Sequence, residues 1–279
     1  MKQRLTIVKV GGAVVEDETQ LAGLLARFTA ITGPKVLVHG GGRRATAVAS
    51  SLGIETKMVE GRRITDEQML QVVTMVYGGL VNKTVVARLQ ALGTNAIGLT
   101  GADAGIIRSK RRPPVSIEGD SPTLVDFGFV GDVSSVDDTM LAQLIDNGMT
   151  PVIAPLTHDG RGNMLNTNAD TMAQETAKAL ARRYDVTLVF AFEKAGVLRQ
   201  ADDEASVIPV IDRQAFDTLR ADGTISGGMV PKIENALRAV EAGVKRVVIT
   251  SAEAIDGEHG TVIQGSGDVK GSEREVKEE

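Results

Sequence analysis

The stretch LTIVKVGG at residues 5–12 is an apolar run that ends in a lysine and two glycines, and VLVHGGG at residues 36–42 repeats the pattern with a histidine and three glycines. Because glycine lacks a Cβ atom, the backbone at these clusters can approach an anion closely, and helices that start after them add oriented N–H donors. Open α/β sheets bind phosphorylated ligands at the ends of parallel strands. Neither cluster has the GxxxxGK[ST] or GxGxxG spacing of the common phosphate loops. The two stretches therefore predict a phosphate site of another kind, where two parallel strands end.

Strand-like and helix-like segments alternate around these clusters. The strand-like runs are Leu5–Val10, Val36–His39, Asn95–Leu99, Thr150–Pro155, Val186–Phe190 and Arg246–Thr250. The helical patterns are Glu18–Ala30, Arg44–Leu52, Asp66–Val76, Leu80–Leu92, Val136–Asn147, Ala169–Arg183 and Met229–Ala242. A composition of 42% hydrophobic but only 3% aromatic residues suits the aliphatic strands of a buried parallel sheet. Together these features predict an α/β protein, a three-layer αβα sandwich with a mostly parallel open sheet.

Three segments depart from this alternation. Residues 106–134 and Leu156–Asn166 are expected to form hairpins on one face of the fold. The basic run RSKRR at 108–112 is interpreted as a solvated hairpin tip in preference to a nucleic-acid site. Residues 265–279 are polar, charged and poor in apolar side chains, which predicts a disordered tail.

Composition excludes several classes of protein. The 279 residues include no cysteine, which rules out disulfides, thiolate metal ligands and cysteine nucleophiles. A formal net charge of −5 argues against general nucleic-acid binding. No uninterrupted apolar stretch approaches the roughly 18 residues of a membrane span, and the N-terminus lacks a secretory signal. We expect a cytoplasmic protein that binds neither nucleic acid nor a membrane.

Two lysines and an aspartate are the first candidates for chemistry. Lys9 interrupts an apolar strand end and is followed at once by glycines, which favours an ammonium beside free N–H groups over a solvent-exposed lysine. Lys232 follows the glycine-rich turn SGGMVPK at 226–232, at the start of a helix. A lysine is unfavourable at that positive helix end, and a bound anion would resolve the conflict. Asp170 in NTNAD could hold both ammonium groups, whereas Asn168 is interpreted as a helix cap.

Arginine and histidine supply the remaining candidates. The sequence EGRRITD at 60–66 places an arginine pair after a glycine turn, and arginine recognises carboxylates through two parallel hydrogen bonds. A solvated surface pair explains this motif equally well. The three histidines are too scattered for a metal or serine triad, and we expect a structural role for His39 rather than that of a general base.

These segments, in this order, resemble the amino-acid kinase superfamily, and within it the kinases that phosphorylate N-acetylglutamate in arginine biosynthesis. The matching segments are KVGGAV at 9–14, VHGGGR at 38–43, EGRRITD at 60–66, VNKTVV at 81–86, GFVGDV at 128–133, NTNAD at 166–170, AGVL at 195–198 and ISGGMVPKIENAL at 225–237. The resemblance implies the amino-acid kinase (carbamate kinase-like) fold, in which residues 1–182 bind the acylglutamate and form the dimer, and residues 183–264 bind ATP. It also implies the reaction: the γ-phosphate of ATP joins the side-chain carboxylate of the substrate, giving an acyl phosphate and ADP.

The resemblance assigns roles to individual residues. Lys9 and Lys232 match the lysines that stabilise the transferring phosphoryl group, and Asp170 matches the aspartate that organises them. The residues that match the substrate site are Gly41, Gly42, Arg63 and Asn166. The residues that match the phosphate and nucleotide contacts are Gly11, Gly12, Glu193, Gly196, Val197, Leu198, Thr224 and Ser226. No residue matches a metal ligand, so Mg²⁺ is expected to be held mainly by the phosphates of ATP and by water.

The sequence departs from the family pattern at two places. FEK at 192–194 stands where the nucleotide segment usually begins with Ser/Thr-Asp, and TGADAG at 100–105 stands where relatives often have a Gly-Lys-Asp arrangement. Acetyl is the expected acyl group, with succinyl as an alternative. A kinase for N-acetyl-aminoadipate, carbamate or uridylate could share the same lysines and glycines. Arg63 and Asn166 favour a substrate with an α-carboxylate over carbamate and uridylate, which leaves N-acetyl-aminoadipate as an alternative. A non-catalytic nucleotide or amino-acid sensor is the alternative from another class.

Regulation can also be predicted from the resemblance. Relatives that are inhibited by arginine carry an extra N-terminal helix that links dimers into hexamers, and only eight residues precede Lys9 here. We expect a homodimer that arginine does not inhibit, formed through the helix at 66–78 and its neighbours.

Overall fold

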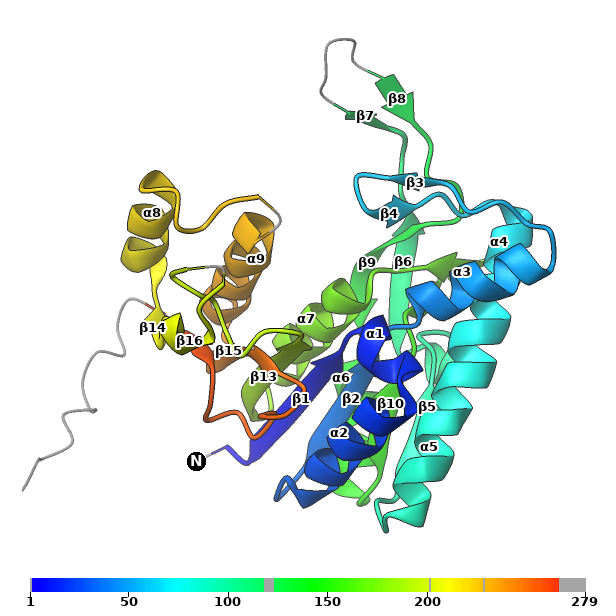
Figure 1. Cartoon of the computed structure of the whole chain (residues 1–279). Helices are drawn as coiled ribbons and strands as arrows, with labels where there is room; N and C mark the ends of the chain where they lie inside the picture. The colour runs from blue at the N-terminus through cyan, green and yellow to red at the C-terminus, as the bar shows by residue number, and fades with distance from the viewer. Residues whose placement is uncertain (1, 118–122, 201, 228, 266–279) are drawn as a thin grey trace, which may run out of the picture.

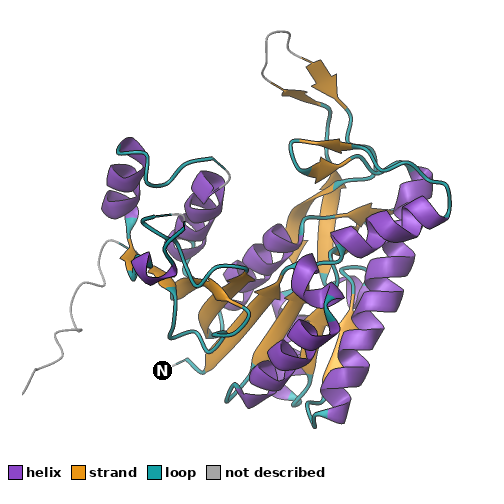
Figure 2. Ribbon diagram, viewed as in Figure 1, coloured by secondary structure: helices purple, strands orange, loops and turns teal. Residues whose placement is uncertain are grey.

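A sheet of eight strands runs through the centre of the protein (Figures 1 and 2). The computed structural model describes residues 2–117, 123–200, 202–227 and 229–265, so the predicted tail beyond Gly265 lies outside the described residues. The strand order is β14-β16-β15-β13-β1-β2-β10-β5, and every neighbouring pair is parallel except β15 with β16. The strands are β1 (Arg4–Val10), β2 (Lys35–His39), β5 (Ala96–Leu99), β10 (Thr150–Ile153), β13 (Asp185–Phe192), β14 (Val210–Ile211), β15 (Arg246–Ser251) and β16 (Thr261–Ile263). The predicted mostly parallel α/β sheet is confirmed.

Helices cover both faces of the sheet and enclose two apolar cores. They are α1 (Gly12–Glu16), α2 (Glu18–Ala30), α3 (Gly42–Ser51), α4 (Glu67–Val73), α5 (Asn82–Ala91), α6 (Asp138–Asp146), α7 (Ala169–Leu180), α8 (Arg213–Ala221) and α9 (Met229–Glu241). Side chains of α1 to α5 pack around Val8 and Val10 of β1, whereas those of α6 to α9 pack around Leu5 and Ile7. Successive side chains of a strand point to opposite faces. Lys9 therefore lies on the face of the sheet that carries α7 and α9.

The helical patterns at Asp66–Val76 and Leu80–Leu92 form one continuous helix, so the predicted break between them is wrong. Asp66 caps its start by accepting a hydrogen bond from the Met69 N–H, and a π-helical turn η1 (Thr74–Val81) joins α4 to α5. The wider turn keeps the backbone hydrogen-bonded through Gly78 and Gly79, so the two helical segments continue as one.

Among the described residues, the stretch Glu67–Ala91 is long and apolar enough to cross a membrane by length and composition alone. Its most apolar window is 44% buried inside the protein, and a core helix passes the same test.

Smaller sheets form the outer layer at the top of Figure 1. β6 (Ile107–Arg111) pairs antiparallel with β9 (Gly131–Val136), and β11 (Leu156–His158) pairs antiparallel with β12 (Met164–Asn166), which confirms both predicted hairpin regions. Two further hairpins are β3 (Met58–Val59) with β4 (Arg62–Arg63), and β7 (Val115–Ile117) with β8 (Thr123–Val125). The basic run at 108–112 lies along β6 and buries Ser109, so its interpretation as a hairpin tip is wrong. Pairing with β9 and β11 places this run inside a sheet, although its composition is that of a solvated loop.

The turn at Gly128 ties the outer layer to the start of α4. Its φ is +71°, the Phe129 N–H donates to the Thr65 carbonyl at 2.7 Å, and a Cβ at Gly128 would collide with that carbonyl. We expect Gly128→Ala to lower the free energy of unfolding in urea by about 3 kcal/mol, because strain and overpacking add. Gly33→Ala is the matched control, since Gly33 has φ +80° with nothing within 4 Å of its Cβ position, and it should cost only about 1 kcal/mol. Equal losses in the two variants would contradict the prediction.

Candidate active site

The two glycine clusters meet at one edge of the sheet. β1 and β2 are parallel neighbours, so the glycines that follow them lie side by side. A Cβ at Gly40 would lie 2.9 Å from the Gly12 nitrogen, and one at Gly12 would lie 3.3 Å from the Gly41 nitrogen. Helices α1 and α3 begin at these glycines and leave their first N–H groups at this edge. The predicted position at the ends of two parallel strands is confirmed.

Lys9 and Asp170 form an ion pair beside these glycines. Lys9 is 7% exposed, and its Nζ lies 2.7 Å from Asp170 Oδ1. Asn168 caps α7 by accepting hydrogen bonds from the N–H groups of Asp170 and Thr171, as predicted, which leaves the carboxylate of Asp170 free to face β1. Lys9 is therefore a buried ammonium with a counter-ion rather than a solvent-exposed lysine.

Phe192 is a third member of this group that the sequence analysis missed. The centre of its ring lies 5.3 Å from Lys9 Nζ and 4.1 Å from Lys232 Nζ. Phe190 stacks on the same ring at a centroid distance of 6.0 Å. The available signal was the pair of phenylalanines at the end of β13 in a chain with only six of them. The two lysines therefore meet at the ring of Phe192, but among the described residues only Lys9 pairs with Asp170, so the prediction that Asp170 holds both ammonium groups is confirmed for Lys9 and not for Lys232.

Two cavities lie nearby, and Lys9 and Asp170 line neither of them. The first, of about 490 Å³, we call the lysine cavity; its lining includes Gly11, Gly12, Glu193, Gly196 and Lys232. Four of the residues matched to nucleotide contacts lie outside that lining: Val197, Leu198, Thr224 and Ser226. Val197 is buried in the core and its N–H donates to Thr261 Oγ1, while the Thr224 N–H donates to Asp222 Oδ1. The structure thus brings together the glycines and Lys232, and leaves the other four outside the lining of this cavity.

The second cavity, of about 220 Å³, we call the arginine cavity. Gly41, Gly42, Arg63 and Asn166 all line it, and Gly42 lines the lysine cavity as well, so the two adjoin. Arg63 Nη2 donates to the Gly42 carbonyl at 2.8 Å and to Thr46 Oγ1 at 2.9 Å. Asn166 Nδ2 donates to Thr65 Oγ1 at 2.9 Å. Both side chains are therefore held in place by neighbours, with the cavity beside them.

The arginine cavity is also lined by Tyr77, Arg62 and Arg112, among other residues. The ring of Tyr77 lies so close to Gly41 that a Cβ there would be 3.0 Å from Tyr77 Cδ1. Burial raises the pKa of the Tyr77 phenol, which keeps it protonated. Arg62 and Arg112 also line the cavity, and Arg112 is paired with Asp132. Tyr77 was missed because its place on the cavity depends on the π-helical turn.

His39 is a structural residue. It is fully buried, with Nδ1 2.8 Å from the Gly40 carbonyl and Nε2 3.1 Å from Asn82 Nδ2. These contacts fit a neutral ring that donates from Nδ1 and accepts at Nε2. Burial lowers the pKa of His39 to about 4, so the imidazole is neutral at pH 7.

The buried imidazole predicts a dependence of stability on pH. Below pH 6.5 the unfolded chain binds a proton at His39 that the folded protein does not bind until about pH 4. The contribution to stability is therefore complete above pH 6.5 and is lost as the pH falls towards 4, by about 3 kcal/mol. Urea unfolding of the protein and of His39→Asn between pH 7 and pH 4 tests this. Identical pH profiles for the two proteins would contradict it.

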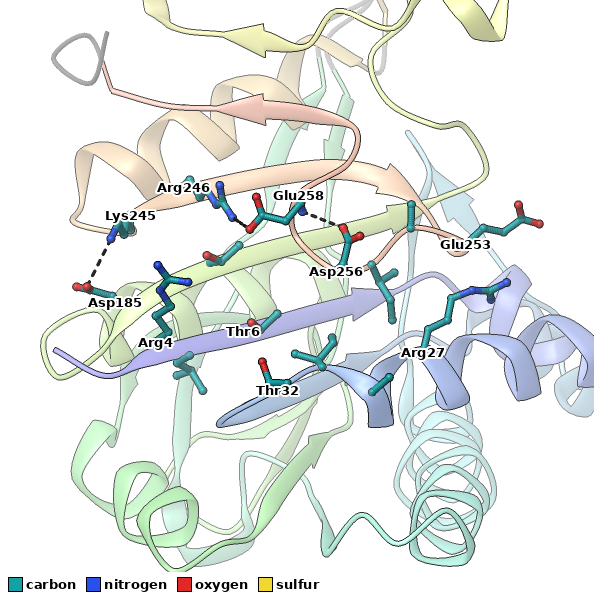
Figure 3. Close-up of a pocket in the computed structure, with 16 residues that line it drawn as sticks. Arg4, Thr6, Arg27, Thr32, Asp185, Lys245, Arg246, Glu253, Asp256 and Glu258 are labelled. Carbon is teal, nitrogen blue, oxygen red and sulfur yellow. Dashed lines mark hydrogen bonds and ion pairs between the residues drawn. The ribbon is translucent and has the colours of Figure 1, made fainter. Parts of the chain in front are cut away.

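A third cavity, of about 660 Å³, lies at the opposite edge of the sheet (Figure 3). It opens near the amino ends of β1, β13 and β15, where Arg246 pairs with Glu258 at 2.5 Å and Lys245 with Asp185 at 3.5 Å. Open parallel sheets bind ligands at the other edge, beyond the carboxyl ends of the strands. The glycine clusters and the paired lysine and aspartate all lie at that other edge.

Comparison with known proteins defines the class. Residues 4–251 match the Amino acid kinase family. The fold agrees: a Streptococcus mutans protein has a TM-score of 0.72 at 25% identity, covering 93% of this chain and 98% of its own. Carbamate kinase from Giardia lamblia bound to AMP-PNP has a TM-score of 0.64 at 16% identity, covering 94% of this chain and 99% of its own. The chain belongs to the amino acid kinase family.

Within that family, the chain is similar to acetylglutamate kinases. The acetylglutamate kinase of Bacteroides thetaiotaomicron is 61% identical over 264 residues, which cover 95% of this chain and all of the relative.

Proposed function

We propose that this protein phosphorylates the side-chain carboxylate of N-acetyl-L-glutamate with ATP, the second step of arginine biosynthesis. The observation that carries the proposal is the meeting of Lys9, Asp170 and Lys232 beside two glycine clusters. The similarity to acetylglutamate kinases over nearly the whole chain supports the choice of substrate.

The arrangement suits a transfer between two anions. The substrate carboxylate is already ionised, so the protein need not supply a nucleophile. It must neutralise the charge that spreads over the phosphoryl oxygens and hold the two reactants in line. We assign the first task to Lys9, Lys232 and the N–H groups at Gly11 and Gly12, and we assign Asp170 to hold Lys9.

The two cavities divide the reactants between them. We assign ATP to the lysine cavity, with contacts from Glu193, Gly196, Val197, Leu198, Thr224 and Ser226. We assign the acylglutamate to the arginine cavity, where Arg63 and Asn166 hold the α-carboxylate and the N–H groups at Gly41 and Gly42 face the substrate. This places the acylglutamate with residues 1–182 and ATP mainly with residues 183–264.

Mg²⁺ is assigned to the phosphates of ATP. No group of three or more histidine, aspartate or glutamate side chains that could hold a metal occurs in the part of the chain that the structure describes. Mg²⁺ keeps several waters and often binds through substrate phosphates. We therefore assign it to enter the lysine cavity together with ATP. When bound, the Mg²⁺ ion would neutralise negative charge on the phosphoryl oxygens.

Arg62 supports succinyl as a second candidate for the acyl group of the substrate. It is exposed, lines the arginine cavity, and has no hydrogen-bond or ion-pair partner for its guanidinium among the described residues. A succinyl group would add a third carboxylate to the substrate, and arginine pairs well with carboxylates. N-succinylglutamate is therefore the second candidate substrate.

ADP release with N-acetylglutamate, N-succinylglutamate and N-acetyl-aminoadipate, measured side by side, tests the proposal. We expect turnover of an acylglutamate and little turnover of the aminoadipate. Arg62→Ala tests the second candidate, because it should weaken N-succinylglutamate more than N-acetylglutamate. Binding without turnover of any of the three would instead support a sensor.

We also assign the protein to the cytoplasm as a homodimer that arginine does not inhibit. The proposed contact is the helix at 66–78 and its neighbours, where Met75 and Leu80 are 56% and 47% exposed. Sedimentation should give a dimer whose activity is unchanged by arginine. A hexamer inhibited by arginine would overturn this assignment.

A further inference from the structure

The ring of Phe192 contacts both lysines of the proposed phosphoryl-transfer site. We infer that Phe192 is a positioning residue that holds the ammonium groups of Lys9 and Lys232 together over its aromatic ring before the substrates bind. The inference rests on the proposed function, because it concerns the lysines assigned there to the transferring phosphoryl group.

Lys232 depends on this ring more than Lys9 does. Lys9 has Asp170 at 2.7 Å as a counter-ion, whereas no carboxylate of the described residues lies within 4.0 Å of Lys232 Nζ. Lys232 is exposed near the N-terminus of α9, where the helix dipole disfavours a positive charge. The ring of Phe192, 4.1 Å from Nζ, is the contact that holds this ammonium near the lysine cavity.

The ring itself is held firmly. Phe192 is the last residue of β13, paired in register with Ser251 of β15, and its ring stacks on Phe190 with an angle of 12° between the planes. It also lines the lysine cavity together with Gly12 and Met229. A fixed ring can therefore fix the position of a flexible lysine side chain.

The electrostatics of an aromatic ring suit this task. The face of a phenyl ring is negative and attracts ammonium groups, without the full charge that would compete for them when phosphate arrives. Two ammonium groups held beside one ring repel each other, and an anion that binds to both offsets this repulsion. Because the ring already holds the two lysines in place, the site is preorganised for the phosphoryl group. An aliphatic side chain of the same size fills the space but offers no such attraction.

Substitutions that remove the aromatic ring, or that weaken its negative face with little change of shape, test the inference. We expect Phe192→Leu to lower kcat about tenfold with a small change in the KM for the acylglutamate, and Phe192→Tyr to keep nearly the parent kcat. Replacement of Phe192 by mono-, di- and trifluorophenylalanine should lower kcat stepwise, because each fluorine weakens the negative face while the shape changes little. The matched control is the same fluorinated series at Phe28, which contacts Lys35 at 5.5 Å on the far side of the sheet and should leave kcat unchanged.

An independent readout does not need turnover. In protein labelled with ¹³C at the lysine ε-carbons, the protons of Lys232 that face the ring should be shifted upfield, and the shift should disappear in Phe192→Leu. Absence of this shift in the parent protein, or a flat kcat across the fluorinated series, overturns the inference. A change confined to the KM for ATP also overturns it, because Phe192 would then contact the nucleotide. If the parent protein turns over no acyl substrate, the proposed function fails, and the lysine spectrum still decides whether Phe192 holds Lys232.

Discussion

Replacement of Lys232 by alanine is expected to lower kcat by about 10²–10³-fold while the protein stays folded. Lys232 is exposed and makes no ion pair with the described residues, so its loss removes few contacts from the folded state. Its ammonium would act mainly where charge develops on the transferring phosphoryl group. An interaction made chiefly in the transition state lowers kcat when it is lost, with little change in KM.

The matched control is Lys245→Ala. Lys245 is also an exposed lysine near the start of a secondary-structure element, but it pairs with Asp185 at the opposite edge of the sheet (Figure 3). We expect this variant to keep the parent kcat. The kcat of both variants is measured as ADP release under saturating ATP and acylglutamate. A Lys232→Ala protein with the parent kcat would contradict the proposed mechanism.

The second large effect concerns the ion pair between Lys9 and Asp170. Lys9 is almost fully buried, so Asp170→Asn leaves an ammonium with no counter-ion and lets it move from its position. We expect Lys9→Met and Asp170→Asn each to lower kcat by about 10²-fold or more, and the double variant to be no slower than Lys9→Met alone. Residues that act as one unit give such non-additive losses.

Stability provides a separate measure of the same pair. Asp170→Asn is expected to lower the free energy of unfolding by about 2 kcal/mol, less than the loss for a fully buried pair, because the Asp170 side chain is 37% exposed. Glu55→Gln is the control, since Glu55 pairs with Lys57 at 3.6 Å through side chains that are 78% and 62% exposed, and it should change stability by less than about 0.5 kcal/mol. In the kcat measurements on Lys9→Met, Asp170→Asn and the double variant, additive losses would show that Asp170 does not act through Lys9.

The sequence predicted most of the fold because its strands and helices carry strong local signals. Apolar runs such as Leu5–Val10 lie within observed strands, a helix begins after Asp66 where its pattern was predicted to start, and Asn168 caps α7 as predicted. The break predicted between Val76 and Leu80 was wrong because a π-helical turn keeps the backbone hydrogen-bonded across Gly78 and Gly79. The hairpin tip predicted at 108–112 was wrong because pairing with β9 overrides the local preference of charged residues for a loop.

The candidate site was predicted in part. Lys9, Asp170 and Lys232 were expected to act together, and the structure places them within reach of one ring. Phe192 and Tyr77 were missed, because an apolar or aromatic residue gives no local sign that it faces a cavity. Their roles depend on the register of β13 with β15 and on the π-helical turn.

By itself, the sequence determined that the glycine clusters follow two parallel strands, that lysines and an aspartate accompany them, and that the chain folds as an α/β sandwich. Those properties follow from residue type and spacing along the chain. Only the tertiary structure decided that Gly12 and Gly41 lie close together, that Lys9 is buried against Asp170, and that one phenyl ring contacts both lysines. The physical reason is that such contacts join β1, β2, α7, β13 and α9, and their distances are set by how the sheet and helices pack rather than by any local pattern.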